Sequence, residues 1–167
     1  MIIRYIISIF FISSMAVGQL FGQQQPVFRQ HGDQLWVDSV FNSLTPDQRL
    51  AQLFMVAAYS NRDSAHIKAL EKLIVEQQIG GLIFFQGGPV RQATMCNYLQ
   101  KRSALPMLIA IDAEWGLGMR LDSTISYPRQ MTLGAIMNDK VIYDMGAEVA
   151  RQMKRMGMHV NFAPVVD

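Results

Sequence analysis

Short apolar runs alternate with segments of helical periodicity along this chain, and this alternation restricts its fold more than any other feature. The runs cover residues 54–58, 82–85, 107–111 and 159–163. Each has the length of a strand and is apolar nearly throughout, which is typical of parallel strands buried on both faces. The sequence therefore predicts an α/β fold of about four β/α units.

Helices are predicted between these runs by capping signals and by the spacing of apolar residues. Thr45 to Gln48 form a capping box with a proline at the first helical position. Further helices are expected over 64–78, from Pro89 to near Ser103, and from Asn138 to Gly157. Their inner faces are expected to carry Leu70, Leu73, Ile74 and Gln77; Met95, Tyr98 and Leu99; and Ile142, Met145, Val149, Met153 and Met156.

Polar residues follow the predicted strands at their carboxyl ends. Gln86, Asp112 and Asp167 each come directly after a strand or within a few residues of one. A small open doubly wound sheet and half of an eight-stranded barrel both place ligands at this edge. A binding site is therefore expected there, while periodicity alone leaves the two architectures open.

The first 22 residues are predicted to be a secretory signal peptide. Arg4 precedes an apolar run over 5–11, and small residues offer cleavage after Ala16 or Gly18. An uncleaved membrane anchor is the alternative, but the run is shorter than the ~20 residues that a spanning helix needs. We expect an exported protein, periplasmic or extracellular in a bacterium, with no stable membrane insertion after cleavage.

Composition narrows the classes of partner and site. Lys and Arg number 15 against 13 Asp and Glu, without long blocks of either sign, so no nucleic-acid partner is expected. Cys96 is the only cysteine, which excludes an internal disulfide. No metal-ligand spacing or phosphate-binding glycine loop is present, so neither a metal nor a cofactor is expected. Residues 23–32 are interpreted as a linker and residues 33–167 as one domain.

The segment after the third run concentrates residues that suit a carbohydrate site. Asp112, Glu114, Trp115 and Arg120 lie within nine residues. A carboxylate accepts hydrogen bonds from sugar hydroxyls, a guanidinium donates to ring substituents, and an indole covers the apolar face of a sugar. Alternatively, Asp112 caps a turn, Glu114 pairs with Arg120 in solvent, and Trp115 belongs to the core.

Three segments in order resemble signatures of family 3 glycoside hydrolases: residues 80–85 (GGLIFF), residues 111–120 with Asp112, Glu114, glycines and Arg120, and residues 161–167 (NFAPVVD). The resemblance covers roughly residues 40–167 and is greatest to the β-N-acetylhexosaminidase branch. It implies the N-terminal half of a TIM-like (β/α)8 barrel. The complete parent protein would be a retaining glycosidase that removes non-reducing-end N-acetylglucosamine from cell-wall or related glycans.

The same resemblance implies roles for individual residues. Asp112 and Arg120 match residues that bind the sugar, and Asp167 is a further candidate for substrate binding or for organising the barrel rim. Glu114 and Trp115 are expected to organise the loop. The nucleophile and the acid/base are expected beyond Asp167, together with further C-terminal domains, so this chain alone should be inactive and either poorly stable or dimeric.

One departure from the family pattern leaves the substrate class open. Where the family usually reads Asp-x-Glu-Gly-Gly-Arg, this chain has Trp115 for the first glycine and Leu117 for the first arginine. A β-glucosidase of the same family is one alternative, and a periplasmic sugar-binding module without catalysis is another. The histidines are poor catalytic candidates: His31 falls in the linker, His66 on a helix, and His159 at the wrong end of a strand.

Overall fold

Residues 34–165 are described by a computed structural model. The chain divides into two units, residues 1–43 and 44–167, and the first contributes helix α3 (Gln34–Ser43) to the described part. The predicted signal peptide, the linker, His31 and Asp167 lie outside the described residues. Within residues 34–165, no helix is both long and apolar enough to cross a membrane.

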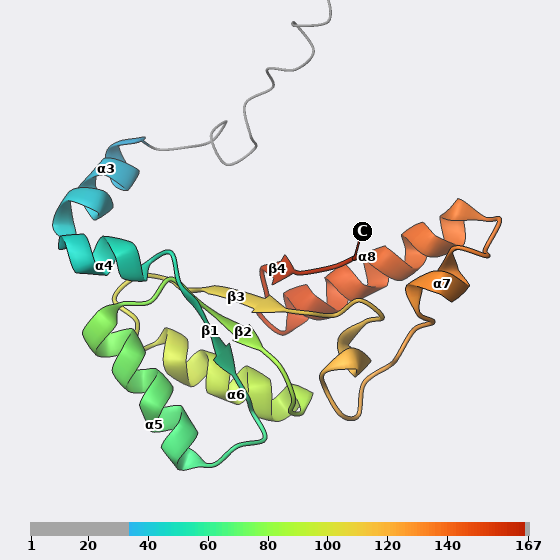
Figure 1. The fold of residues 1–167 in the computed structure, drawn as a ribbon, viewed down its shortest axis with the longest axis horizontal. Helices are drawn as coiled ribbons and strands as arrows, with labels where there is room; N and C mark the ends of the chain where they lie inside the picture. Colours follow the sequence, from blue (N-terminus) through green and yellow to red (C-terminus); the bar gives the residue numbers. More distant parts are fainter. Residues whose placement is uncertain (1–33, 166–167) are drawn as a thin grey trace, which may run out of the picture. The chain divides into compact units, whose positions relative to one another are not determined.

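The second unit is built on a parallel sheet of four strands in the order β1-β2-β3-β4 (Figure 1). A doubly wound sheet reverses its strand order at a switch point, whereas a barrel adds each strand beside the previous one. The unreversed order is that of the first half of a barrel, and it contradicts the open-sheet alternative. The strands are β1 (Met55–Ala58), β2 (Gly81–Phe84), β3 (Leu108–Ile111) and β4 (Val160–Asn161).

Helices begin where the sequence predicts their caps. The Thr45 hydroxyl accepts a bond from the Gln48 N–H at 3.3 Å, and the Gln48 side chain accepts one from the Thr45 N–H at 2.9 Å. Asn138 accepts a bond from the Lys140 N–H at 3.1 Å. The helical elements are α4 (Pro46–Ala51), α5 (Ser64–Lys72), a π-helical turn (Leu73–Gln77), α6 (Pro89–Gln100), a 3₁₀ turn (Leu117–Met119), α7 (Gln130–Leu133) and α8 (Asp139–Arg155).

One apolar core joins α5, α6 and α8 to a single face of the sheet. Alternate strand residues pack into it, namely Val56, Ala58, Leu82, Phe84, Ile109 and Ile111. Right-handed crossovers between successive neighbouring strands place the crossover helices α5, α6 and α8 on the same face. The residues in between, such as Ile83 and Leu108, therefore face the side that becomes the interior of a barrel, and Leu108 is 54% exposed there.

This one-sided packing corrects the prediction for the first strand. The run over 54–58 was expected to be buried on both faces, yet only Ala58 is fully buried and Met55 to Ala57 are half-buried. The helices cover one face only, and the described residues cover the other face in part. β1 thus carries apolar residues on both faces, as a strand of a closed barrel does, although the described residues cover only one face fully.

Helix winding also differs from the prediction over 64–78. Leu70 and Ile74 are buried as expected, but Leu73 and Gln77 are exposed. The π-helical turn accommodates more residues per turn than an α-helix and so shifts the buried face. On α6, Tyr98 is also more exposed than predicted, because its hydroxyl donates a bond to Glu71 Oε2 at 2.8 Å on the surface.

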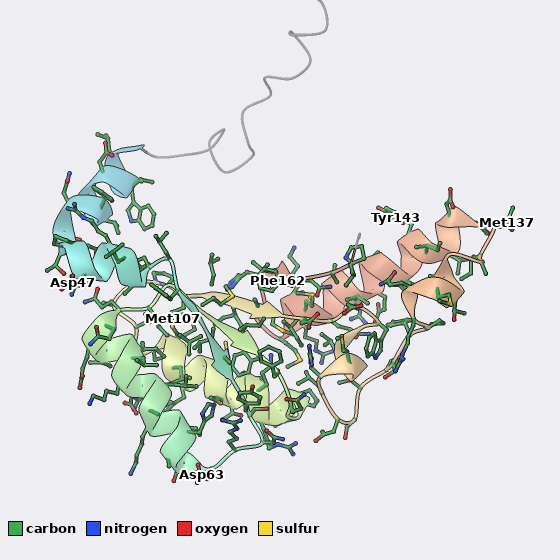
Figure 2. The ribbon with its side chains drawn as sticks, viewed as in Figure 1. Asp47, Asp63, Met107, Met137, Tyr143 and Phe162 are labelled. Carbon is green, nitrogen blue, oxygen red and sulfur yellow. The ribbon has the colours of Figure 1, made fainter. Side chains whose placement is uncertain are left out.

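The apolar stripe on α8 is confirmed. Val149 and Met153 are buried, and Ile142, Met145 and Met156 are half-buried. Tyr143 and Met137 project outward near the start of this helix (Figure 2). The predicted fourth strand is shorter than expected: pairing with β3 covers Val160–Asn161, while bonds from the His159 and Phe162 N–H groups reach the Ile109 and Ile111 carbonyls at 2.8 and 3.0 Å.

Candidate functional site

A row of side chains stands at the carboxyl ends of the first three strands. Ala58, Phe84 and Ile111 are partners in the sheet register and face the helices. Because side chains alternate along a strand, the next residues, Tyr59, Phe85 and Asp112, face the opposite side, toward the barrel interior. The Tyr59 and Phe85 rings stack with centroids 5.6 Å apart, as this placement requires.

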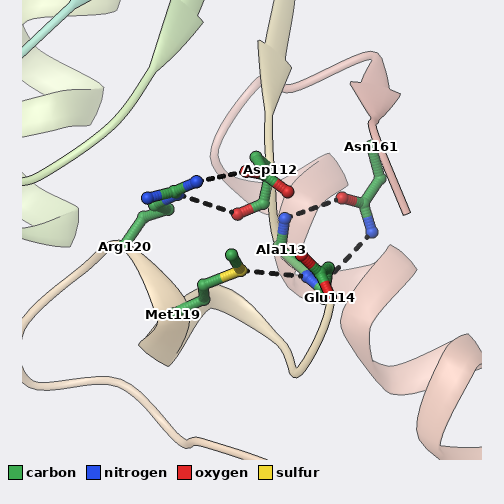
Figure 3. A network of polar contacts seen from close by, with 6 residues as sticks. All are labelled: Asp112, Ala113, Glu114, Met119, Arg120 and Asn161. Atoms are coloured by element: carbon green, nitrogen blue, oxygen red, sulfur yellow. Dashed lines mark hydrogen bonds and ion pairs between the residues drawn. The ribbon is translucent and has the colours of Figure 1, made fainter. Parts of the chain in front are cut away.

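Arg120 completes this row from the loop after β3. Its Nη2 donates to Asp112 Oδ2, and its Nε donates to the Asp112 carbonyl at 3.2 Å (Figure 3). The side chains are only 18% and 24% exposed for Arg120 and Asp112. The structure thus brings together the two residues that the resemblance singles out, and the alternative pairing of Arg120 with Glu114 is wrong.

Main-chain bonds hold Arg120 in position. The Gly87 N–H, in the loop after β2, donates to the Arg120 carbonyl at 3.2 Å, and the Asp122 N–H donates to the Gly87 carbonyl at 2.8 Å. Gly87 and Leu121 form a parallel bridge between the two loops. The loop that carries Arg120 is therefore anchored to the loop after β2 as well as to β3.

Asn161 anchors the start of the same loop from β4. Its Oδ1 accepts a bond from the Ala113 N–H at 3.0 Å, and its Nδ2 donates to the Ala113 carbonyl at 3.4 Å (Figure 3). Both main-chain polar groups of Ala113 are thereby matched by one amide side chain. Sequence reasoning treated Asn161 only as part of a motif, since nothing local signals a bond to a residue 48 positions earlier.

The main-chain carbonyls of Glu114 and Trp115 bond this loop to the segment over residues 127–130. The Glu114 carbonyl accepts a bond from Gln130 Nε2 at 2.9 Å, and the Trp115 carbonyl accepts one from the Tyr127 N–H at 2.9 Å. The half-buried Trp115 ring lies 4.9 Å from the Arg129 guanidinium carbon. Within residues 34–165, the Glu114 carboxylate has no hydrogen-bond or ion-pair partner.

The two described histidines bond to main-chain groups. His66 Nε2 accepts a bond from the Tyr59 N–H at 3.1 Å, and His159 Nδ1 accepts one from the Ile109 N–H at 3.0 Å. Burial lowers the pKa of His66, and the nearby Arg62 lowers it further. His159 precedes β4 and so lies at the end of the sheet away from Asp112.

The Asp112–Arg120 pair keeps hydrogen-bonding capacity for a ligand. Among the described residues, nothing bonds to Asp112 Oδ1 or to Arg120 Nη1. The pair carries no net charge and presents an acceptor and a donor beside two aromatic rings, which suits a neutral polyhydroxy ligand. No cluster of His, Cys, Asp and Glu side chains that could hold a metal ion occurs in residues 34–165.

A cavity of about 490 Å³ lies between α7, α8 and the chain after β3 and β4, and its lining includes neither Asp112 nor Arg120. The apolar faces of α7 and α8 form most of its lining, with Glu114 and Asn161 at one side. It offers few polar groups to fix a ligand's orientation, so we place the candidate site at Asp112 and Arg120.

Comparisons with known proteins agree with this fold. The model of the glycosyl hydrolase family 3 N-terminal domain matches residues 45–167. Beta-hexosaminidase LpqI of Mycobacterium tuberculosis is 27% identical over 128 residues, covering 74% of this chain and 31% of that protein. Beta-hexosaminidase A of Pseudoalteromonas piscicida is 29% identical over 150 residues, covering 74% of this chain and 25% of that protein. The chain thus spans less than a third of the length of these relatives.

A solved structure shows the same chain path. The structure of beta-glucoside phosphorylase BglX bound to 2FGlc matches with a TM-score of 0.71 at 20% sequence identity, covering 80% of this chain and 24% of that one. This likeness shows the fold alone. Together with the family match over residues 45–167, it establishes that the chain belongs to glycosyl hydrolase family 3, with the fold of that family's N-terminal barrel domain.

Proposed function

We propose that the whole protein is a retaining glycosidase that hydrolyses β-glycosidic bonds at a non-reducing-end N-acetylglucosamine, and that Asp112 and Arg120 bind this sugar. The observation that carries the proposal is the neutral Asp112–Arg120 pair at the carboxyl end of β3, on the sheet face away from the helices. Enzymes with this barrel bind their substrates at that end.

The names of the relatives support the sugar class. Three curated relatives at 27–30% identity, from Mycobacterium tuberculosis, Pseudoalteromonas piscicida and Thiobacillus denitrificans, are named beta-hexosaminidases. A relative from Cellulomonas fimi, 23% identical over 132 residues, is named beta-N-acetylglucosaminidase/beta-glucosidase. The name of this relative includes both activities, so β-glucosidase activity is the alternative. The substrates of the two activities differ in the substituent at the second carbon of the sugar.

Bond cleavage needs groups other than this pair. A retaining glycosidase uses a nucleophilic carboxylate and an acid/base about 5–5.5 Å apart on either side of the scissile bond. Asp112 is bound by Arg120 through both its carboxylate and its carbonyl, which suits holding a sugar better than attacking one. We assign the nucleophile and the acid/base to other parts of the whole protein.

The test uses the product of the complete open reading frame, assayed on aryl β-N-acetylglucosaminide and aryl β-glucoside. Asp112→Asn should lower kcat/KM by about tenfold to hundredfold, the worth of a hydrogen bond to a charged group. Asp122→Asn is the matched control, because Asp122 also pairs with an arginine, Arg91 at 2.5 Å, but at the surface. Equal effects of the two substitutions would refute the site, and faster hydrolysis of the glucoside would favour the alternative.

We also propose that the protein is exported and acts on a glycan outside the cytoplasm. The apolar run over 5–11 and the small residues Ala16 and Gly18 support this assignment. N-terminal sequencing of the mature protein from the producing cell should find cleavage after one of these two residues. A mature protein that still begins at Met1 would contradict it.

A further inference from the structure

We propose that Phe85 is a positioning residue for Arg120, acting through the face of its aromatic ring. The inference rests on the proposed function, in which the Arg120 guanidinium binds the sugar. Phe85 directly follows β2 and is half-buried in the row that faces the barrel interior.

Phe85 contacts both the Arg120 guanidinium and a second aromatic ring. The Arg120 guanidinium carbon lies 4.7 Å from the Phe85 ring centroid. The Tyr59 ring stacks on Phe85 at 5.6 Å with an interplanar angle of 22°, and the Arg62 guanidinium carbon lies 3.8 Å from the Tyr59 centroid. Arginine is attracted to the face of an aromatic ring, and this attraction grows as the pair is removed from water.

Asp112 alone does not fix the orientation of the Arg120 guanidinium. The two bonds to Asp112 hold one edge of the planar group, which can still rotate about that edge. The Phe85 ring, with the guanidinium carbon over it, restricts this rotation. Phe85 thus directs the remaining Nη1 donor toward one place, where the proposed sugar would accept its bond.

Tyr59 keeps the Phe85 ring in place from the neighbouring strand. Its main-chain N–H is bonded to His66 Nε2 at 3.1 Å, and the His66 ring meets the Tyr59 ring edge-on at 5.7 Å. The orientation of Arg120 therefore depends on residues from three loops, which follow β1, β2 and β3.

The experiment replaces Phe85 with 3,4,5-trifluorophenylalanine in the product of the complete open reading frame. Fluorination leaves a ring of similar shape packed against Tyr59 but removes the negative potential on its face, so the attraction to the guanidinium is lost. The readout is the rate at which phenylglyoxal modifies Arg120, measured by peptide mass spectrometry. We expect this rate to rise by about threefold to tenfold, because a guanidinium no longer held against the ring is more often open to the reagent.

Two references accompany the measurement. The same replacement at Phe162, which is 54% exposed and follows β4, should leave the Arg120 rate unchanged. Arg102, whose guanidinium lies 3.5 Å from the Tyr98 centroid, should react at the same rate in all variants. An Arg120 rate unchanged by fluorination of Phe85, with Arg102 also unchanged, would overturn the inference.

A second pair of variants keeps the test decisive if the fluorinated protein cannot be prepared. Phe85→Tyr retains the ring and should protect Arg120 as wild type does, whereas Phe85→Leu should not. Protection by leucine equal to that by tyrosine would also overturn the inference. The labelling requires no turnover, so an inactive protein with a protected Arg120 would refute the proposed function while leaving the role of Phe85 standing.

Discussion

Gly116 is the position in the site loop where we expect a single methyl group to do the most damage. Its backbone has φ +83° and ψ −179°, a conformation that is essentially restricted to glycine. A Cβ there would also lie 2.6 Å from Tyr127 Cδ2, in a ring that packs against the core. Gly116→Ala therefore combines backbone strain with a steric clash.

The magnitude follows from these two contributions. Backbone strain of this kind costs about 1–3 kcal/mol, and forcing extra volume into a packed site costs about 1–3 kcal/mol more. We expect Gly116→Ala to lower the free energy of unfolding by about 2–6 kcal/mol, a large part of the total stability of an ordinary domain.

Substitutions of two other glycines separate the cost of backbone strain from the cost of the steric clash. Gly157, after α8, has φ +73° but open space around its Cβ position, so Gly157→Ala should cost only the left-handed strain of about 1–2 kcal/mol. Gly146, within α8, has neither problem, so Gly146→Ala should raise stability by up to about 1 kcal/mol through helix propensity.

Hydrogen exchange provides the assay. Peptides that cover β3 report the free energy of opening of this unit in the product of the complete open reading frame, whatever other domains it contains. The expected order of stability is Gly146→Ala, wild type, Gly157→Ala and then Gly116→Ala. A Gly116→Ala protein as stable as Gly157→Ala would show that the contact with Tyr127 contributes nothing, and one as stable as wild type would refute the reasoning altogether.

Three further predictions concern anchors of the fold. Asn161→Ala should speed exchange of the Ala113 amide by at least about tenfold, measured by the same method, because a buried N–H loses its partner. Thr45→Ala should lower the thermal stability by about 1 kcal/mol through loss of the helix cap, whereas Thr45→Ser should not. Burial lowers the pKa of His66, so its neutral form stabilises the fold fully above about pH 6.5, and this contribution is lost as the pH falls through the lowered pKa. The protection of the Tyr59 amide, which bonds to His66, should therefore fall in acid relative to the intrinsic exchange rate at each pH, and His66→Gln should remove this loss of protection.

Much of the secondary structure could be predicted because its causes are local. Thr45 and Asn138 cap helices through bonds to residues two or three positions away, and the structure confirms both predicted caps. One error arose from a distant contact: the Tyr98 hydroxyl bonds to Glu71, 27 residues earlier, and Tyr98 is therefore more exposed than predicted. A second arose from local winding, because the π-helical turn moves Leu73 out of the buried face.

The candidate site also has features that could be predicted from the sequence and features that could not. The positions of Asp112 and Arg120 after a predicted strand were visible in the sequence, but their pairing with each other was not. Either carboxylate of the loop was a possible partner for Arg120, and the choice depends on which side of the sheet each residue faces. Phe85 had no local feature that marked it, because its contacts with Arg120 and Tyr59 arise from the register of neighbouring strands.

The sequence by itself thus determined the parallel α/β class, the helix caps and the loop where polar residues gather, because periodicity and capping act over a few residues. Only the tertiary structure decided the unreversed strand order, the partner of Arg120 and the bond from Asn161 to Ala113. These features depend on residues tens of positions apart meeting at the edge of one sheet, where strand pairing and packing against the helices, rather than local preference, select the neighbours.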